Sequence, residues 1–407
     1  MPERAFVGFG FGPIQAGLFL CEAAASGAFS RLVVAEIVDD VVLSVRRAGG
    51  AYSVNIATST GIEKRRVSGV EIYNPLREPD REELIRAVAE ASELATALPS
   101  VRAYGCGRPG DPVDILGRGI RKKLEDSSFP AAVLYAGENH NHAAELLDEA
   151  LASAFGIQGN GRFQAVNTVI GKMSGVVSDE RQMAEQELAP VTPGAGRAFL
   201  VEEFNRILIG RIAIPGFRRG IAAFEEKPDL LPFEEAKLYG HNAVHALIGY
   251  LLRIRGAARM SDAASFPDIL ALARDAFLQE SGAALCSKYA GLDPLFSVDG
   301  FAVYADDLIR RMLNPHLRDS VARVTRDPRR KLGWDDRLVG TMRLALSRGI
   351  EPNRFALGAA AALKAVAAEE NISENEALES LWGEEAADSA MKRRVRDLIA
   401  RSLPCLK

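Results

Sequence analysis

The chain has 407 residues, with 48% hydrophobic and 26% charged side chains and a formal net charge of −4. This is the composition of an ordinary soluble protein, and the length exceeds what one hydrophobic core organises, so we expect two domains. Because no basic face is implied, the charge argues against nucleic acid and anionic membrane surfaces as partners.

The start of the chain and the cysteines favour a cytoplasmic protein. The stretch "MPERAFVGFG" lacks a basic segment followed by an apolar one, and no apolar run reaches the roughly 18 residues of a membrane span. The cysteines are scattered without CxxC spacing, at Cys21, Cys106, Cys286 and Cys405, which argues against a zinc ribbon or a disulfide framework. We expect a monomer or a small homo-oligomer with a small-molecule substrate.

The first half of the chain alternates apolar strands with helices. Residues 4–9 predict a buried strand, the turn "GFGPIQAG" leads into a helix at 14–27, and residues 31–36 predict a second strand. Further strands are predicted at 51–57 and 131–139, and a helix begins at residue 81. This order predicts an α/β fold with a Rossmann-type doubly wound sheet.

From about residue 233 the pattern is mostly helical. Period and length predict five helices, at 233–254, 266–285, 301–313, 334–349 and 354–370. We place the boundary near residue 195. The prediction is therefore a sheet domain at 1–195 that binds a dinucleotide and a mostly α-helical domain at 196–407 that carries substrate and catalytic groups.

The turn "GFGFGPIQAG" can be read as GxGxxG with Gly10, Gly12 and, in place of the third glycine, Gln15. Gly10 would permit the tight turn, Gly12 would let the backbone approach a pyrophosphate, and the helix N-terminus would supply N–H donors. Gln15 is bulkier than the glycine that usually lets helix and strand pack closely. The alternative is a tight turn that binds no ligand.

Glu36 ends the second predicted strand. A carboxylate at this point accepts hydrogen bonds from both ribose hydroxyls and repels a 2′-phosphate, so the sequence predicts NAD rather than NADP. The alternative is a strand-end acid in solvent.

The stretch "KLYGHNAVHALIGYLLR" is an apolar helix that carries Lys237, Asn242 and His245 on one side, within about 140° of arc. Burial lowers the pKa of a lysine, which suits a general base for an alcohol proton. An asparagine can donate to a developing alkoxide, and a histidine can orient the substrate oxygen. This set suits hydride transfer between an alcohol and a nicotinamide without a metal. The alternative is a helix at a domain interface with Lys237 at its solvated end.

The pattern Lys-x4-Asn-x2-His resembles the signature of the polyol-specific long-chain dehydrogenases of the mannitol dehydrogenase family, which use a lysine and no zinc. The stretches "LVVAEIVDDVVLSV" and "NPHLRDSVARVTRDPRRKLGWDDRLVG" are similar to segments of the mannitol-1-phosphate 5-dehydrogenases of that family. The resemblance runs through most of the chain. It implies NAD as cofactor and the interconversion of a hexitol phosphate, such as mannitol 1-phosphate, with the ketose fructose 6-phosphate.

The resemblance also implies catalytic roles. Lys237 would be the general acid/base, with Glu234 helping to relay its proton. Asn242 would lie on the oxyanion side together with Asn139, and His245 would hold the reacting oxygen.

Substrate and cofactor contacts follow from the same resemblance. Arg323 and Lys331 would face the distal end of the substrate, and Thr96 would contact the cofactor. The chain departs from the family in "RILIG", where Ile207 replaces a tryptophan and Gly210 an acid. These departures put the substrate in doubt more than the fold.

Two other classes of function compete. The segment "ENHNHAAE" offers Glu138, His140, His142 and Glu145 to a metal, although a helix would separate the two histidines. The departures at Gln15, Ile207 and Gly210 also allow an NAD-binding protein without turnover, but the intact Lys237, Asn242 and His245 argue against it.

Within the dehydrogenase class the substrate stays open. The segment Arg329–Lys331, with Arg323 and Arg326, could bind a phosphate, or these cations could pair with Asp327, Asp335 and Asp336. An unphosphorylated polyol or a hexonate is the alternative substrate.

Overall fold

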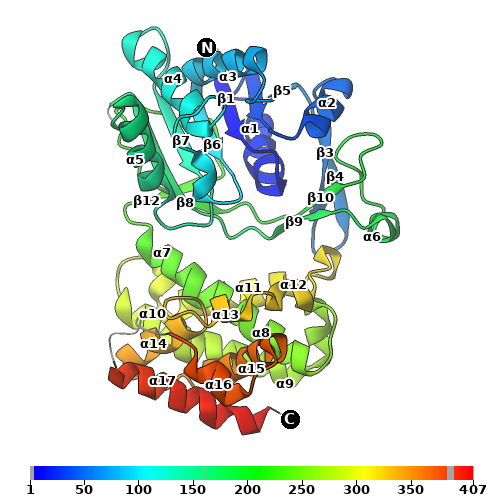
Figure 1. Cartoon of the computed structure of the whole chain (residues 1–407), viewed down its shortest axis with the longest axis vertical. Coiled ribbons are helices and arrows are strands. Elements are labelled where there is room, and N and C mark those ends of the chain that lie inside the picture. Colours follow the sequence, from blue (N-terminus) through cyan, green and yellow to red (C-terminus); the bar gives the residue numbers. More distant parts are fainter. Residues whose placement is uncertain (1–3, 160, 383–388, 407) are drawn as a thin grey trace. The chain divides into compact units, whose positions relative to one another are not determined.

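The computed structural model describes residues 4–159, 161–382 and 389–406, and the chain forms two compact units (Figure 1). Unit 1 ends at Leu230 and unit 2 begins at Leu231. The boundary predicted near residue 195 is therefore wrong. The reason is that the strands at 198–227, which read as the start of the second domain, complete the two sheets of unit 1.

An eight-stranded sheet organises unit 1. Its strands lie in the order β12 (Phe224–Lys227), β11 (Ile207–Gly210), β8 (Phe163–Val169), β7 (Ala132–Ala136), β6 (Ala91–Thr96), β1 (Ala5–Phe9), β2 (Arg31–Ala35) and β5 (Val70–Tyr73). The six strands from β8 to β5 are parallel, whereas β11 runs antiparallel to β8. This order confirms the doubly wound Rossmann sheet, with its switch point between β1 and β6.

Two buried cores lie against the main sheet, one on each face. Strand β1 shows why, because successive side chains of a strand point to opposite faces: Phe6 belongs to one core, and Val7 and Phe9 to the other. The second core packs against the helices α3 (Glu78–Glu90), α4 (Pro112–Glu125) and α5 (Ala143–Phe155). The first core includes the helix that follows the glycine turn, which has a π-helical turn at Gln15–Phe19 and continues as α1 (Leu20–Ser26).

A second, four-stranded sheet was not predicted. Its order is β4 (Ile62–Val67), β3 (Tyr52–Ala57), β10 (Ala198–Glu202) and β9 (Ser174–Val177). Residues 51–57 were correctly predicted as a strand, but they pair here rather than in the doubly wound sheet. Buried Asn55 ties the sheet together, because its amide donates to Ala189 O and Phe199 O. Short helices α2 (Asp39–Arg47) and α6 (Glu180–Glu185) complete unit 1.

Unit 2 is helical in its described part, as predicted. Its helices are α7 (Leu231–Glu235), α8 (Ala243–Ile254), α9 (Pro267–Asp275), α10 (Ala283–Lys288), α11 (Val298–Met312), α12 (Val321–Thr325), α13 (Pro328–Lys331), α14 (Val339–Ser347), α15 (Asn353–Glu370), α16 (Glu374–Glu379) and α17 (Ser389–Ser402). Two π-helical segments, Ala236–Asn242 and Ala276–Gly282, join α7 to α8 and α9 to α10.

Close packing around α8 holds unit 2 together. Gly249 of α8 lies against Val324 of α12, and Gly358 of α15 lies against Leu247, so closely that a Cβ at either glycine would overlap its neighbour. Buried Glu280 accepts hydrogen bonds from the backbone N–H groups of Arg354 and Phe355 at the start of α15. Nowhere in the described residues is a helix long and apolar enough to cross a membrane.

Candidate active site

The glycine turn after β1 requires Gly10. Its φ is 85°, and a Cβ at this position would lie 2.9 Å from Ala97 O. A Cβ on Gly12 would meet no atom within 4 Å, so the backbone there borders open space. Space beside Gly12, at the N-terminus of a helix, fits the pyrophosphate of a dinucleotide.

Gln15 occupies a packing position behind the turn. Its side chain is fully buried, and a Cβ added to Gly8 of β1 would overlap its amide. Gly8 thus provides the space that the missing third glycine of the motif usually gives to the helix and strand. Neither amide atom of Gln15 has a hydrogen-bond partner among the described residues. Contact between Gln15 and a cofactor stays a prediction.

Glu36 lies half-buried just beyond β2, beside the glycine turn. Its Oε2 accepts a hydrogen bond of 3.0 Å from Phe11 N, and its Oε1 accepts one of 2.8 Å from Val38 N. These bonds fix the carboxylate, and each oxygen keeps a further lone pair for a donor. The arrangement fits the ribose hydroxyls of a dinucleotide bound at the turn.

A buried carboxylate joins the ends of β6 and β7. Glu138 accepts hydrogen bonds from Thr96 Oγ1 at 2.8 Å, Tyr104 Oη at 2.5 Å and Leu98 N at 2.8 Å. Burial, together with the charge of Glu138, raises the pKa of Tyr104 well above its usual range. Thr96 is therefore buried and bonded to Glu138, and its contact with a cofactor stays a prediction. Asn139, the next residue along the chain, is exposed.

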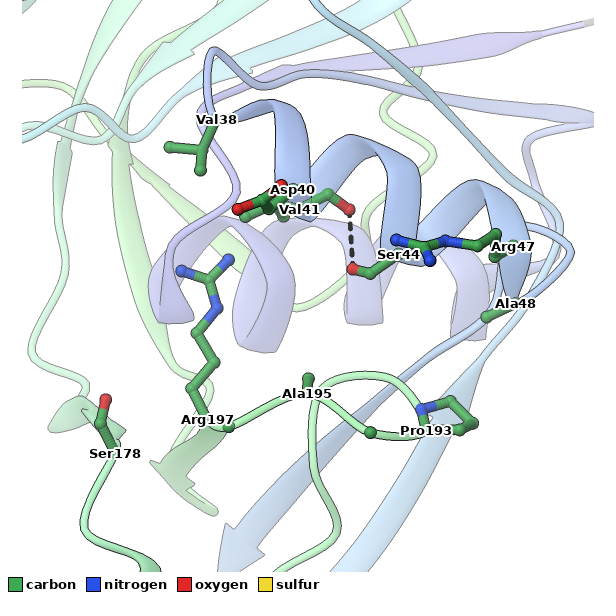
Figure 2. Close-up of a pocket in the computed structure, with 12 residues that line it drawn as sticks. Val38, Asp40, Val41, Ser44, Arg47, Ala48, Ser178, Pro193, Ala195 and Arg197 are labelled. Carbon is green, nitrogen blue, oxygen red and sulfur yellow. Dashed lines mark hydrogen bonds between the residues drawn. The ribbon is translucent and has the colours of Figure 1, made fainter.

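A cavity of about 840 Å³ lies along α2 in unit 1, and nothing in the sequence predicted it. It begins at Val38, close to Glu36, and faces the loop at 193–197 (Figure 2). Figure 2 shows the Arg197 side chain rising from this loop toward the end of α2 that carries Asp40. With Arg47 also in its wall, the cavity presents charges of both signs along α2.

The histidines of "ENHNHAAE" precede α5 and are exposed. The rings of His140 and His142 lie 6.2 Å apart, and His142 N donates to His140 Nδ1 at 3.1 Å. Among the described residues, no group of three or more histidine, cysteine or acidic side chains is placed to hold a metal ion.

Lys237 lies in the π-helical segment Ala236–Asn242 of unit 2, half-buried between α7 and α8. Burial lowers the pKa of Lys237 to about 8, with Arg337 adding to the shift and Glu234 opposing it. A lysine with such a pKa is partly neutral near pH 7 and can accept a proton. The apolar remainder of α8, from Ala246 to Leu252, is buried as predicted.

His245 and Asn242 follow Lys237 on the same helix and are half-buried. His245 Nε2 lies 3.1 Å from Asp319 Oδ2. Asp319 also pairs with Arg323, which donates from Nε and Nη2 at 2.6 and 2.7 Å. Although burial alone would raise it, the contacts with His245 and Arg323 lower the pKa of Asp319 to about 2. No role was predicted for Asp319, although it lies inside the stretch "NPHLRDSVARV" that resembles the family.

Two further residues of this region were not predicted. Arg337, paired with Asp336 at 2.8 Å, lies near enough to Lys237, His241 and Lys331 to lower the pKa of each. Burial, with His245 and Arg311 nearby, lowers the pKa of His241 well below its usual range. The sequence carried no signal for these effects, because they depend on residues brought together from α8, α11 and the segment after α13.

The basic residues expected at the distal end of the substrate all have partners. Arg323 pairs with Asp319, Arg329 with Glu370 at 2.5 Å, and Arg330 with Asp336 at 3.5 Å. Lys331 is buried, donates to Arg326 O, and has its pKa lowered by burial to about 8. Of the acids considered as partners, Asp336 pairs with Arg330 and Asp327 approaches Arg326, whereas Arg323 and Arg329 pair with other carboxylates. Substrate contacts of Arg323 and Lys331 stay predictions.

The departures in "RILIG" fall in β11 of unit 1. Ile207 is fully buried in the core that also holds Phe6 and Phe224, so it replaces a tryptophan in a packing position. A Cβ on Gly210 would lie no closer than 3.6 Å to Val166, so the loss of the family acid there is not forced by crowding.

Unit 1 has a dinucleotide-type turn with a carboxylate at the end of the next strand. Unit 2 has a half-buried lysine on a helix that also carries an asparagine and a histidine. Together these features are typical of the dehydrogenase class of oxidoreductases. Comparison with known proteins names the family. The mannitol dehydrogenase C-terminal domain matches residues 229–402. The chain belongs to the mannitol dehydrogenase family and is a polyol dehydrogenase.

Relatives agree with this assignment, and two solved structures share the fold. The chain is 30% identical to a mannitol-1-phosphate 5-dehydrogenase of Brevibacillus brevis over 77% of its own length and 74% of the relative. It is 28% identical to one from an Exiguobacterium species over 80% and 77%. The mannitol 2-dehydrogenase of Pseudomonas fluorescens, solved with NAD and D-mannitol, shares the fold with a TM-score of 0.71 at 14% identity, over 99% of this chain and 92% of that one. A D-sorbitol dehydrogenase gives 0.75 at 13% identity, over 99% and 95%.

Proposed function

We propose that this protein is an NAD-dependent dehydrogenase that interconverts a hexitol phosphate and the corresponding ketose phosphate, with Lys237 as its general acid/base. The observation that carries the proposal is the lysine itself. Burial places the pKa of Lys237 near 8, on a helix that also presents Asn242 and His245. That combination supports proton transfer from an alcohol at near-neutral pH by a side chain.

In the oxidation direction, neutral Lys237 takes the proton of the reacting hydroxyl at Nζ. Asn242 donates to the oxygen as negative charge develops on it, and His245 orients the polyol. When bound, NAD accepts the hydride from the carbinol carbon. Asn139 of unit 1 is proposed for the oxyanion role only on the family resemblance.

The residues around Gly12 and Glu36 support NAD as the cofactor. The backbone at Gly12 has room for a phosphate, and Glu36 presents a fixed carboxylate beside the turn. A 2′-phosphate on the ribose would place negative charge next to the Glu36 carboxylate, and the repulsion disfavours NADP.

The phosphate on the substrate is supported by the relatives named mannitol-1-phosphate 5-dehydrogenase. One observation favours a second candidate, an unphosphorylated polyol or a hexonate. Arg323, Arg329 and Arg330 each face a carboxylate, which leaves less positive charge for a phosphate.

NADH formation at 340 nm by the purified protein tests the proposal. The substrates are mannitol 1-phosphate, sorbitol 6-phosphate, mannitol, arabinitol and a hexonate, each with and without a chelator. We expect chelator-resistant oxidation of a hexitol phosphate. Activity on mannitol, arabinitol or the hexonate alone would establish the second candidate. No turnover on any of them, with NAD binding intact by calorimetry, would overturn the proposed function.

A further inference from the structure

His245 and Asp319 meet in unit 2 although they are far apart in the sequence. Nε2 of His245 lies 3.1 Å from Oδ2 of Asp319, and their side chains are 14% and 7% exposed. This nitrogen is buried and forms no hydrogen bond of normal geometry with any described residue, Asp319 included. The carboxylate of Asp319 is nevertheless the charged group that lies against Nε2.

Asp319 is held firmly in its place. Arg323, one helical turn further along in α12, donates a hydrogen bond to each of the two carboxylate oxygens. The backbone is tied as well, because Met260 N donates to Asp319 O at 2.9 Å and Val321 N donates to Ala258 O at 2.9 Å. Ser320 caps α12 by accepting from Arg323 N. A carboxylate fixed by side chain and backbone can in turn fix the ring that it contacts.

The charge of Asp319 decides which nitrogen of His245 carries hydrogen. An ionised carboxylate beside Nε2 favours the tautomer with hydrogen on Nε2, because the partial positive charge of the N–H then lies next to negative charge. Nδ1 is left as the nitrogen that accepts a hydrogen bond. In the proposed reaction, this acceptor would face a hydroxyl of the polyol while Lys237 takes the proton.

We propose that Asp319, anchored by Arg323, is a positioning residue that holds His245 in its Nε2-protonated form for the polyol. The role in turnover rests on the proposed function. The inference also reassigns Arg323. The family resemblance implies contact with the substrate, whereas here its guanidinium is the anchor of the carboxylate behind the histidine.

The first test reads the histidine directly and needs no turnover. Nitrogen-15 NMR of the side chains distinguishes the two tautomers, and the chain has only five histidines. We expect His245 to be Nε2-protonated in the unmodified protein and to shift toward the other tautomer in Asp319→Asn. Asp306→Asn is the matched control, because Asp306 forms a similar two-bond pair with Arg274, at 2.6 and 2.9 Å, on an exposed surface. An Nδ1-protonated His245, or no change in Asp319→Asn, overturns the inference.

The second test uses polyol oxidation. Asp319→Asn is expected to lower kcat by up to about 100-fold, the scale of a misplaced catalytic group, with Asp306→Asn unchanged. Unchanged kcat in Asp319→Asn overturns the catalytic part. If the unmodified protein oxidises no polyol, the proposed function fails, and the NMR result still decides the contact.

Arg323→Gln covers the case in which Asp319→Asn does not fold. Arg323 is half-exposed, so the variant should fold. We expect a severalfold loss of kcat with little change in KM, because Asp319 loses its anchor. A rise in KM at unchanged kcat would show direct contact with substrate and would overturn the reassignment.

Discussion

Unit 1 and unit 2 hold their polar groups in different ways. In unit 1 the groups sit at strand ends and are fixed by hydrogen bonds from nearby donors. Glu36 accepts from two main-chain N–H groups, and Glu138 accepts from Leu98 N and from the hydroxyls of Thr96 and Tyr104. In unit 2 the groups lie along a helix, and their properties depend on burial and on charged partners. Burial lowers the pKa of Lys237, and Asp319, from a distant segment, lies against His245. A carboxylate held by main-chain donors, as Glu36 is, keeps its position when one neighbouring side chain changes. A pKa that depends on burial and on charged partners changes with each partner.

The largest expected effect is at Lys237. Lys237→Ala should lower kcat for polyol oxidation by at least about 100-fold, the scale of lost general acid–base catalysis, with NAD affinity unchanged. Steady-state kinetics and calorimetry measure the two quantities. Lys364→Ala, a partly exposed lysine of α15, is the control and should leave both unchanged. Near-normal turnover in Lys237→Ala would remove the lysine from the mechanism.

The pH profile should follow the lysine. Oxidation needs neutral Lys237, so below its pKa of about 8 the rate of oxidation should rise about tenfold per pH unit and then level off. Reduction of the ketose needs the protonated form, so its rate should fall above that pH. Initial rates in both directions between pH 6 and 10 test this. A profile that is flat across pH 8 in both directions would contradict the assignment.

A smaller effect is expected in unit 1, at the cofactor. Glu36→Gln should weaken NAD binding and reduce the preference for NAD over NADP by roughly 10-fold, the scale of one hydrogen bond to a charged group. Titration calorimetry with both cofactors measures the change. Glu63→Gln, at an exposed position of β4, is the matched control. An unchanged preference would show that Glu36 only supports the turn through Phe11 N.

The smallest effect on turnover, but a measurable one on stability, is expected behind the turn. Gly8→Ala should lower the free energy of unfolding by about 1–3 kcal/mol, because the new methyl group overlaps the Gln15 amide. Adding Gln15→Gly should restore much of that loss in urea unfolding. The methyl group added by Gly12→Ala would enter open space, so this variant should fold normally but bind NAD more weakly. If the double variant is no more stable than Gly8→Ala, the two positions are not coupled.

Much of unit 1 was predictable because its signals are local. The strand at 4–9, the turn at Gly10 and Gly12, and Glu36 at the next strand end follow one another within a single βαβ unit, and the structure places them together. The predicted domain boundary was wrong, since β10 pairs with β3 and β11 pairs with β8, and β12 then adds to β11. The second sheet was missed for the same reason. Gln15 departs from the glycine expected at the third position of the motif. The space for its side chain is provided by Gly8 on the facing strand.

The sequence by itself determined the family, the doubly wound sheet, the helical second half, and the side of one helix that carries Lys237, Asn242 and His245. Those features depend on the period of apolar residues and on spacings of a few positions, which the backbone geometry of a helix or strand converts directly into direction. Folding decided the state of the groups: the lowered pKa of Lys237 and the contact of Asp319 with His245. Burial and Coulomb interactions depend on distance in space, and here they join His245 of α8 to Asp319, just before α12, which are far apart in the sequence.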